Sequence, residues 1–63
     1  MNRLLKAKIV EKFGTQGDFA AAIKADEAVV SRVIRGRREL NVESQKKWAD
    51  KLECRPVEIF QDN

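Results

Sequence analysis

The chain has 63 residues, of which 43% are hydrophobic and 37% are charged, and its formal net charge is +3. A chain of this length is expected to form one domain, over residues 1–63, and folding buries only about 60% of the surface of the unfolded chain. It contains no histidine and one cysteine, so an internal disulfide is excluded and neither a zinc site nor a histidine-assisted hydrolase is expected. We therefore expect a protein that is not an enzyme, has no cofactor and takes no small-molecule ligand.

No run approaches the roughly 18 to 20 consecutive apolar residues that a membrane-spanning helix needs. No signal-peptide pattern precedes the first predicted helix. We expect a cytoplasmic protein without a membrane partner. Cys54, between Leu52 and Pro56, is interpreted as a small packed hydrophobic residue.

The first two helices are predicted from their apolar spacing and from the residues between them. The apolar residues of the first helix share one side: Leu5, Ile9, Val10 and Phe13. Gly14 is expected to end this helix in a left-handed conformation. The hydroxyl of Thr15 can then cap a second helix, from about Gln16 to Lys24. Its inward side chains are expected to be Phe19, Ala20 and Ile23.

Three more helices follow. Asp26 is expected to cap a third helix over Glu27 to Arg35, which Gly36 ends. Asn41 then caps a fourth helix. The expected buried stripe of the fourth helix is Val42, Gln45, Trp48, Ala49 and Leu52. Pro56 suits the first turn of a short fifth helix. No alternating strand pattern appears, so the predicted fold class is all-α, a compact arrangement of five helices.

The third predicted helix separates apolar side chains from polar ones. At about 100° per residue, Val30, Val33 and Ile34 fall within one arc of about 100°. The opposite arc holds small and polar or cationic residues: Ala28, Ser31, Arg32 and Arg35. A helix with its side chains is about 10 to 12 Å across and the major groove of DNA is about 12 Å wide, so this arc can enter the groove.

Positive charge is concentrated at the end of this helix. From Ala28 to Arg38 there are four arginines and no acidic residue. The fourth predicted helix instead mixes lysines with acidic residues, as a solvated surface does. The placement of the arginines, more than the net charge, indicates a surface for a polyanion. The alternative is an ordinary surface helix with solvated arginines.

A larger pattern becomes visible when these residues are combined. It consists of Gln16, Phe19-Ala20, Ile23, Ala25, Val30-Ser31-Arg32-Val33 and Gly36. This pattern resembles the lambda-repressor and Cro-like helix-turn-helix family of phage and bacterial transcription regulators, with the motif at residues 16–36. The resemblance extends over nearly the whole chain, because that family also has one helix before the motif and two after it. It implies a lambda-repressor-like domain that binds double-stranded DNA in a sequence-specific way, similar to a small Cro-type repressor of a phage or prophage.

The chain departs from the family pattern at one position. The family usually has glycine in the turn between the two motif helices, in a left-handed conformation, where this chain has Lys24. A lysine in that conformation costs about 1 kcal/mol.

The resemblance also implies roles for individual residues. The expected base-contacting residues are Glu27, Ala28 and Arg32. Arg32 is the first choice, because a guanidinium group can bridge O6 and N7 of guanine. Glu27 could accept from cytosine, could hold Gln16 or an arginine in place, or could simply complement the helix dipole. Ala28 could touch a thymine methyl group or be exposed filler.

The expected phosphate-contacting residues are Gln16, Ser31, Arg35, Arg37 and Arg38. A module this small has a limited interface, so we expect a homodimer, at least on DNA, on a pseudo-palindromic operator. The candidate dimer residues are Val57, Ile59 and Phe60, with closure of the monomer core as the alternative. The rival function is an antitoxin-like protein-interaction module that also binds DNA. An inert helical bundle is the third possibility.

Overall fold

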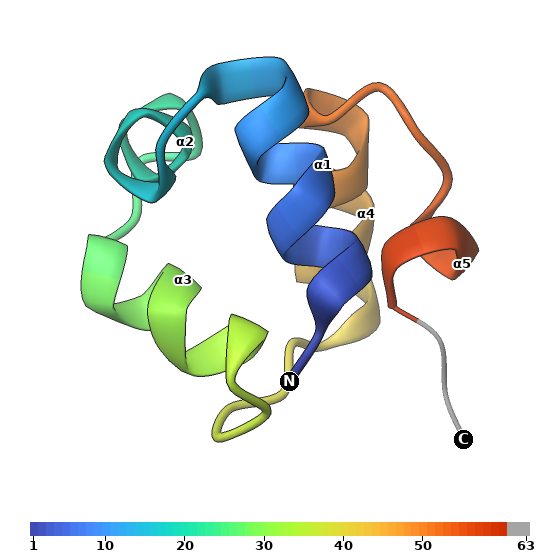
Figure 1. Cartoon of the computed structure of the whole chain (residues 1–63). Coiled ribbons are helices and arrows are strands. Elements are labelled where there is room, and N and C mark those ends of the chain that lie inside the picture. Colours follow the sequence, from blue (N-terminus) through green and yellow to red (C-terminus); the bar gives the residue numbers. More distant parts are fainter. Residues whose placement is uncertain (61–63) are drawn as a thin grey trace.

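The computed structural model describes residues 1–60; residues 61–63, the end of the predicted single domain, lie outside the described residues. Within residues 1–60 there are five helices and no strand (Figure 1). They are α1 (Arg3–Phe13), α2 (Gln16–Ala22), α3 (Glu27–Ile34), α4 (Val42–Lys51) and α5 (Pro56–Ile59). The predicted all-α class with five helices is confirmed for these residues. The second and third helices end two residues and one residue earlier than predicted.

Side-chain caps set several of the helix starts. The hydroxyl of Thr15 accepts a hydrogen bond from the backbone N–H of Asp18 at 3.1 Å, as predicted. The side chain of Asn41 accepts from the backbone N–H of Ser44 at 2.8 Å. Asp26 takes the N-cap position of α3, but its side chain makes no capping hydrogen bond, so α3 begins without the predicted side-chain cap.

The α1 helix contacts α2, α3 and α5, while α4 lies behind it in the view of Figure 1. The buried apolar side chains form one cluster: Leu5, Ile9, Phe19, Ala20, Ile23, Val30, Val33, Ile34, Trp48, Ala49, Leu52 and Ile59. Phe19 lies at its centre, because its ring packs edge-on against Phe13 at 5.3 Å and against Trp48 at 5.4 Å between ring centroids. Such pairs add to the free energy gained from burial alone. One buried ring thus joins α1, α2 and α4.

Two valines predicted to face inward are exposed. In α1 the buried arc is centred on Ile9, with Leu5 about 40° to one side, and Val10 lies about 100° away. Val10 is therefore 52% exposed. Val42 is 65% exposed because it is the first residue of α4 and lies about 80° around the helix from Leu52. The predicted buried stripes of α1 and α4 were correct at their centres, but each included one valine too many at its edge.

Asn2 connects three helices. Its side-chain oxygen accepts from the backbone N–H of Leu5 at 3.0 Å and so caps α1. Its side-chain amide donates to the carbonyl oxygen of Ile59 in α5. Its backbone N–H donates to the carbonyl oxygen of Ile34, at the end of α3. One residue before the first helix thus fixes the ends of α3 and α5 relative to α1.

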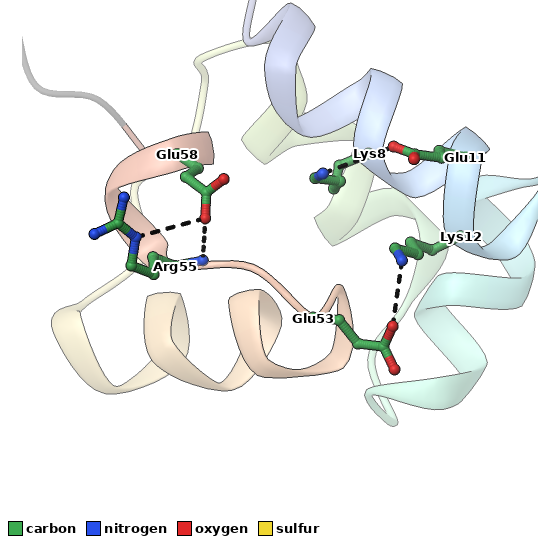
Figure 2. A network of polar contacts seen from close by, with 6 residues as sticks. All are labelled: Lys8, Glu11, Lys12, Glu53, Arg55 and Glu58. Atoms are coloured by element: carbon green, nitrogen blue, oxygen red, sulfur yellow. Dashed lines mark hydrogen bonds and ion pairs between the residues drawn. The ribbon is translucent and has the colours of Figure 1, made fainter.

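Lys24 is left-handed, with φ of 58°. Its N–H donates to the carbonyl of Ala21 at 3.2 Å, and the next N–H, of Ala25, donates to the carbonyl of Ala20 at 2.9 Å. This pair of bonds is the Schellman pattern that usually places glycine at this position. Glu53 ends α4 in the same way, with φ of 56°. There the exposed carboxylate reaches Lys12 of α1 at 3.2 Å (Figure 2).

Among residues 1–60, no helix combines the length and the apolar character needed to cross a membrane. The longest, α1, has 11 residues. A spanning helix needs about 20.

Replacing Lys24 by glycine should stabilise the fold. The Lys24→Gly variant removes a left-handed lysine, so we expect a gain of about 1 kcal/mol and a rise of about 4–8 °C in the thermal midpoint. Thermal unfolding followed by circular dichroism measures it. The matched control is Ala21→Gly, an exposed position inside α2, which should lower the midpoint. A lower midpoint for Lys24→Gly would show that Lys24 is not left-handed in solution.

Removing the side chain of Asn2 should cost more than removing an isolated cap. Asn2→Ala loses the cap of α1 and the bond to Ile59, so we expect a loss of about 2 kcal/mol in the free energy of unfolding. Asn41→Ala, which loses one cap, should cost about 1 kcal/mol. Asn2→Asp keeps the acceptor and loses the donor, and should fall between wild type and Asn2→Ala. Urea denaturation gives these values; equal losses for the two alanine variants would mean that the bond to Ile59 contributes nothing.

Candidate nucleic-acid interface

The rotation of α3 about its own axis is fixed by its buried side. Val30, Val33 and Ile34 are all buried, as predicted, and α3 packs against α2 and α1. Burying three branched aliphatic side chains stabilises this orientation by several kcal/mol, at about 1.5 to 3 kcal/mol for each. A rotation that turned the helix over would expose all three. The opposite side of α3 is therefore the side that faces solvent.

That outer side carries the residues expected from the sequence. Ala28, Arg32 and Arg35 are exposed, and Ser31 is half-buried. Ser31 is thus less accessible than predicted, because it lies at the edge of the outer arc, beside the buried Ile34. The exposed side chain near the start of this outer side is that of Ala28, which is small. The outer side becomes cationic toward the end of α3.

The turn after α3 holds the backbone of the following residues close to the last turn of the helix. Gly36 has φ of 80°, and its N–H donates to the carbonyl of Val33 at 3.1 Å. The N–H of Arg37 then donates to the carbonyl of Arg32 at 2.9 Å. This is again a Schellman pattern, here with the favoured glycine. It brings the backbone of Arg37 back against the last turn of α3.

Within residues 1–60, the four guanidinium groups at this end have no anionic partner. In the part of the chain that the structure describes, the ion pairs join Lys8 to Glu11, Lys12 to Glu53 and Arg55 to Glu58 (Figure 2). None involves the arginines at positions 32, 35, 37 and 38, all of which are exposed. Their positive charges interact favourably with the negative end of the helix dipole at the C-terminus of α3. They also leave a cationic surface open to an external anion.

Arg38 lies apart from the outer side of α3. It borders a groove of about 550 Å³ between the N-terminal segment, the α3–α4 connection and α5. Other residues lining the groove include Asn2, Leu40, Gln45 and Phe60. The structure therefore assigns Arg38 to the edge of the cationic surface.

The first turns of α2 and α3 lie together. A Cβ atom built on Gly17 would lie 3.5 Å from a carboxylate oxygen of Glu27, so this carboxylate lies over the first turn of α2. Gln16, the first residue of α2, is half-buried. Within residues 1–60, no hydrogen bond or ion pair joins Glu27 to Gln16 or to an arginine. The position of Glu27 favours the helix-dipole interpretation, because the N-terminal end of a helix attracts negative charge.

The three candidate dimer residues have different surroundings. Ile59 is 1% exposed, so in this structure it closes the monomer core, the alternative that the sequence left open. Phe60 is half-buried, with its ring 6.3 Å from that of Trp48. Val57 is 60% exposed. Of the three, Val57 alone has most of its side chain available to a partner.

Cys54 is half-buried and packs against the core, as expected for a small hydrophobic residue. Burial raises the pKa of its thiol, and the carboxylate of Glu58 adds to the rise. Such a thiol is protonated near neutral pH and is a weak nucleophile. Among residues 1–60, no group of three or more histidine, cysteine or acidic side chains could hold a metal ion.

Two features of the surface were not predicted. The position of the Glu27 carboxylate near Gly17 depends on how α2 and α3 pack, so the sequence alone does not predict it. The one sequence feature that could have indicated it is Gly17, a glycine inside a predicted helix. The exposed apolar side of α1, with Leu4 and Val10, was missed because Val10 was assigned to the core. Leu4, on the far side of the helical wheel from Ile9, was the available signal.

No family model, curated protein or solved structure matches this chain. The lambda-repressor-like pattern therefore stays a resemblance, carried by the residues quoted above for it. The cationic outer side of α3, which follows from burial and charge, is independent of that resemblance.

Proposed function

We propose that this protein binds double-stranded DNA in a sequence-specific way and acts as a small transcriptional repressor of the Cro type. The observation that carries the proposal is the surface at the end of α3: exposed arginines that have no anionic partner among residues 1–60, on a helix whose other side is buried. Phosphate contacts from such groups supply much of the affinity of DNA-binding proteins. The shape of the outer side fits the proposal, since it offers small residues first and guanidinium groups farther along.

In this proposal α2, the turn at Lys24 and α3 act as a helix-turn-helix, and residues 27–35 form the recognition helix. Two observations support it. The small, buried Ala20 lies in α2, which packs against α3, so the two helices can approach closely. The Schellman turn between them is the place where the family has glycine.

Individual residues then take distinct roles. Arg32, exposed on the outer side, reads a guanine through two hydrogen bonds, an interaction that contributes about 1 to 3 kcal/mol of discrimination. Ala28 lies near the groove floor and contacts a thymine methyl group. Glu27 orients the first turns of α2 and α3 and accepts from a base only if its carboxylate moves away from Gly17.

The remaining residues hold the phosphate backbone. Gln16 and the first turn of α2 approach one phosphate of the DNA. Arg35 and Arg37 contact a different phosphate, beyond the end of α3. Ser31 contributes from the edge of the outer side, and Arg38 contacts a phosphate from its separate position beside the groove that α5 lines.

Two copies of the domain fit one operator. The domain extends 28 × 23 × 20 Å, which is less than the roughly 34 Å between half-sites on successive turns of one DNA face. Two copies can therefore lie side by side on a pseudo-palindromic site. Selection of binding sites from a random DNA pool tests the proposal. An enriched, symmetric sequence supports it, whereas no enrichment, together with affinity that disappears in salt, would refute it.

Arg32→Ala should weaken the binding of each copy to its half-site by about 10- to 100-fold, because each copy loses one bidentate base contact. It should also relax the preference at one base pair in each half-site. Repeating the selection with the variant measures both effects. Arg55→Ala, which removes an arginine from the N-cap of α5, is the matched control and should leave the preference unchanged. Unchanged affinity and preference for Arg32→Ala would mean that α3 does not dock in the proposed way.

Arg38→Ala should instead weaken binding to all sequences alike. Losing one phosphate contact in each copy should reduce the slope of log affinity against log salt concentration by about one for each bound copy. Fluorescence anisotropy over a salt series measures the slope. Lys47→Ala, an exposed residue of α4 outside the proposed interface, should leave the slope unchanged. An identical slope for Arg38→Ala and wild type would remove Arg38 from the interface.

A further inference from the structure

The outer side of α1 is an exposed apolar surface that the proposed DNA interface does not use. Leu4 is 50% exposed, Val10 is about equally exposed, and Ala7 between them is also exposed. These three residues follow one another at a spacing of three, so they lie along one row of the helix surface. They face away from Leu5 and Ile9, whose side chains are buried in the core. In Figure 1, α1 lies in front of α4.

The same side of α1 has a groove and carries charged residues at defined positions along the helix. A shallow groove of about 560 Å³ runs along it, lined by Met1, Arg3, Lys6, Ala7, Val10 and Glu11. Arg3 and Glu11 stand four residues before and four residues after Ala7. They therefore belong, with Ala7, to a second row of the helix surface that crosses the apolar row at Ala7. The cation lies at one end of this row and the acid at the other.

This arrangement is self-complementary. If a second copy packs its α1 antiparallel to the first, with the crossing point at Ala7, a residue of either row before Ala7 lies beside the residue equally far after Ala7 in the other copy. Lys6 and Lys8 lie on the flanks of this contact, about 100° around the helix from Ala7. Arg3 then lies beside Glu11 of the second copy, and Leu4 lies beside Val10 of the second copy. A two-fold axis repeats both contacts, which is the property of an isologous interface.

We propose that the outer side of α1 binds a second copy of this chain through an antiparallel α1–α1 contact. Charge complementarity selects this occupant, because a partner must present an acid opposite Arg3 and a cation opposite Glu11 with apolar residues between. The small side chain of Ala7 at the crossing point allows the two helix axes to approach closely.

The ion pairs of the monomer leave this contact available. Arg3 has no ion pair in the part of the chain that the structure describes. Glu11 lies 3.7 Å from Lys8, and its side chain remains 64% exposed (Figure 2). One carboxylate can accept from two cations, so Glu11 can bind Arg3 of the second copy without losing Lys8.

The α1 face is better suited to self-association than α5 is. On α5 a single valine, Val57, is largely exposed, whereas α1 offers a row of apolar residues with charges at both ends. The proposal does not rest on DNA binding, since it uses a different helix and different side chains. Failure of one therefore leaves the other standing.

A charge swap tests the contact. Arg3→Glu places two acids beside each other at both ends of the interface, and Glu11→Arg places two cations there. Each single variant should weaken dimerisation at least about tenfold, measured by sedimentation velocity on the full chain without DNA. The double variant Arg3→Glu/Glu11→Arg restores opposite charges and should return the dissociation constant to within about threefold of wild type. Recovery in the double variant cannot come from simple unfolding, and circular dichroism checks that each variant remains helical.

Two controls make the outcome decisive. Lys46→Glu changes the charge by the same amount on α4 and should leave the dimer unchanged, while Val10→Asp should disrupt it. The proposal is overturned if the chain stays monomeric up to about 1 mM. It is equally overturned if a dimer forms that resists both single charge variants, or if Val57→Asp disrupts the dimer and Val10→Asp does not.

Discussion

The burial of Val30 and its neighbours on α3 is the constraint on which the rest of the structure depends. A helix of eight residues has little stability of its own in water, so its position is set by the side it buries. With Val30, Val33 and Ile34 held against α1 and α2, the other side of α3 must face solvent. The exposure of Arg32 is therefore a consequence of packing on the opposite side of the helix. Its own interactions do not determine it.

Other contacts keep α3 in place from both ends. At its start, the carboxylate of Glu27 lies over the first turn of α2, within van der Waals reach of a Cβ atom built on Gly17. At its end, the backbone of Asn2 bonds to Ile34, and the side chain of Asn2 bonds to α5. A small domain has few buried contacts, so each such tie is a large share of its stability. A recognition surface on a loop would lack this support.

Local chemistry made much of the fold predictable from the sequence. The caps at Thr15 and Asn41 follow from hydrogen bonds within three residues, and the buried side of α3 follows from its spacing. Ile59 could not be assigned from the sequence, because core and dimer contact require the same apolar residue. Val10 was wrongly assigned since α1 has apolar residues on two sides, and only tertiary packing decides which of them is buried. The candidate site was predictable to a similar degree, since the exposure of Arg32 follows from α3 alone, while the position of Arg38 depends on α5 and the N-terminal segment.

The distribution of charge separates the two surfaces that we propose for binding. From Ala28 to Arg38 there are four arginines and no acid, a pattern suited to a polyanion and unsuited to a second copy, because like charges would meet across a two-fold axis. The outer side of α1 carries the cations Arg3 and Lys6 together with the acid Glu11, and apolar residues lie between Arg3 and Glu11. That pattern is poorly suited to DNA, since the carboxylate would face phosphate. Self-association through α1 therefore leaves the arginines of α3 exposed, and a single small domain can hold both surfaces because they belong to different helices that share one core.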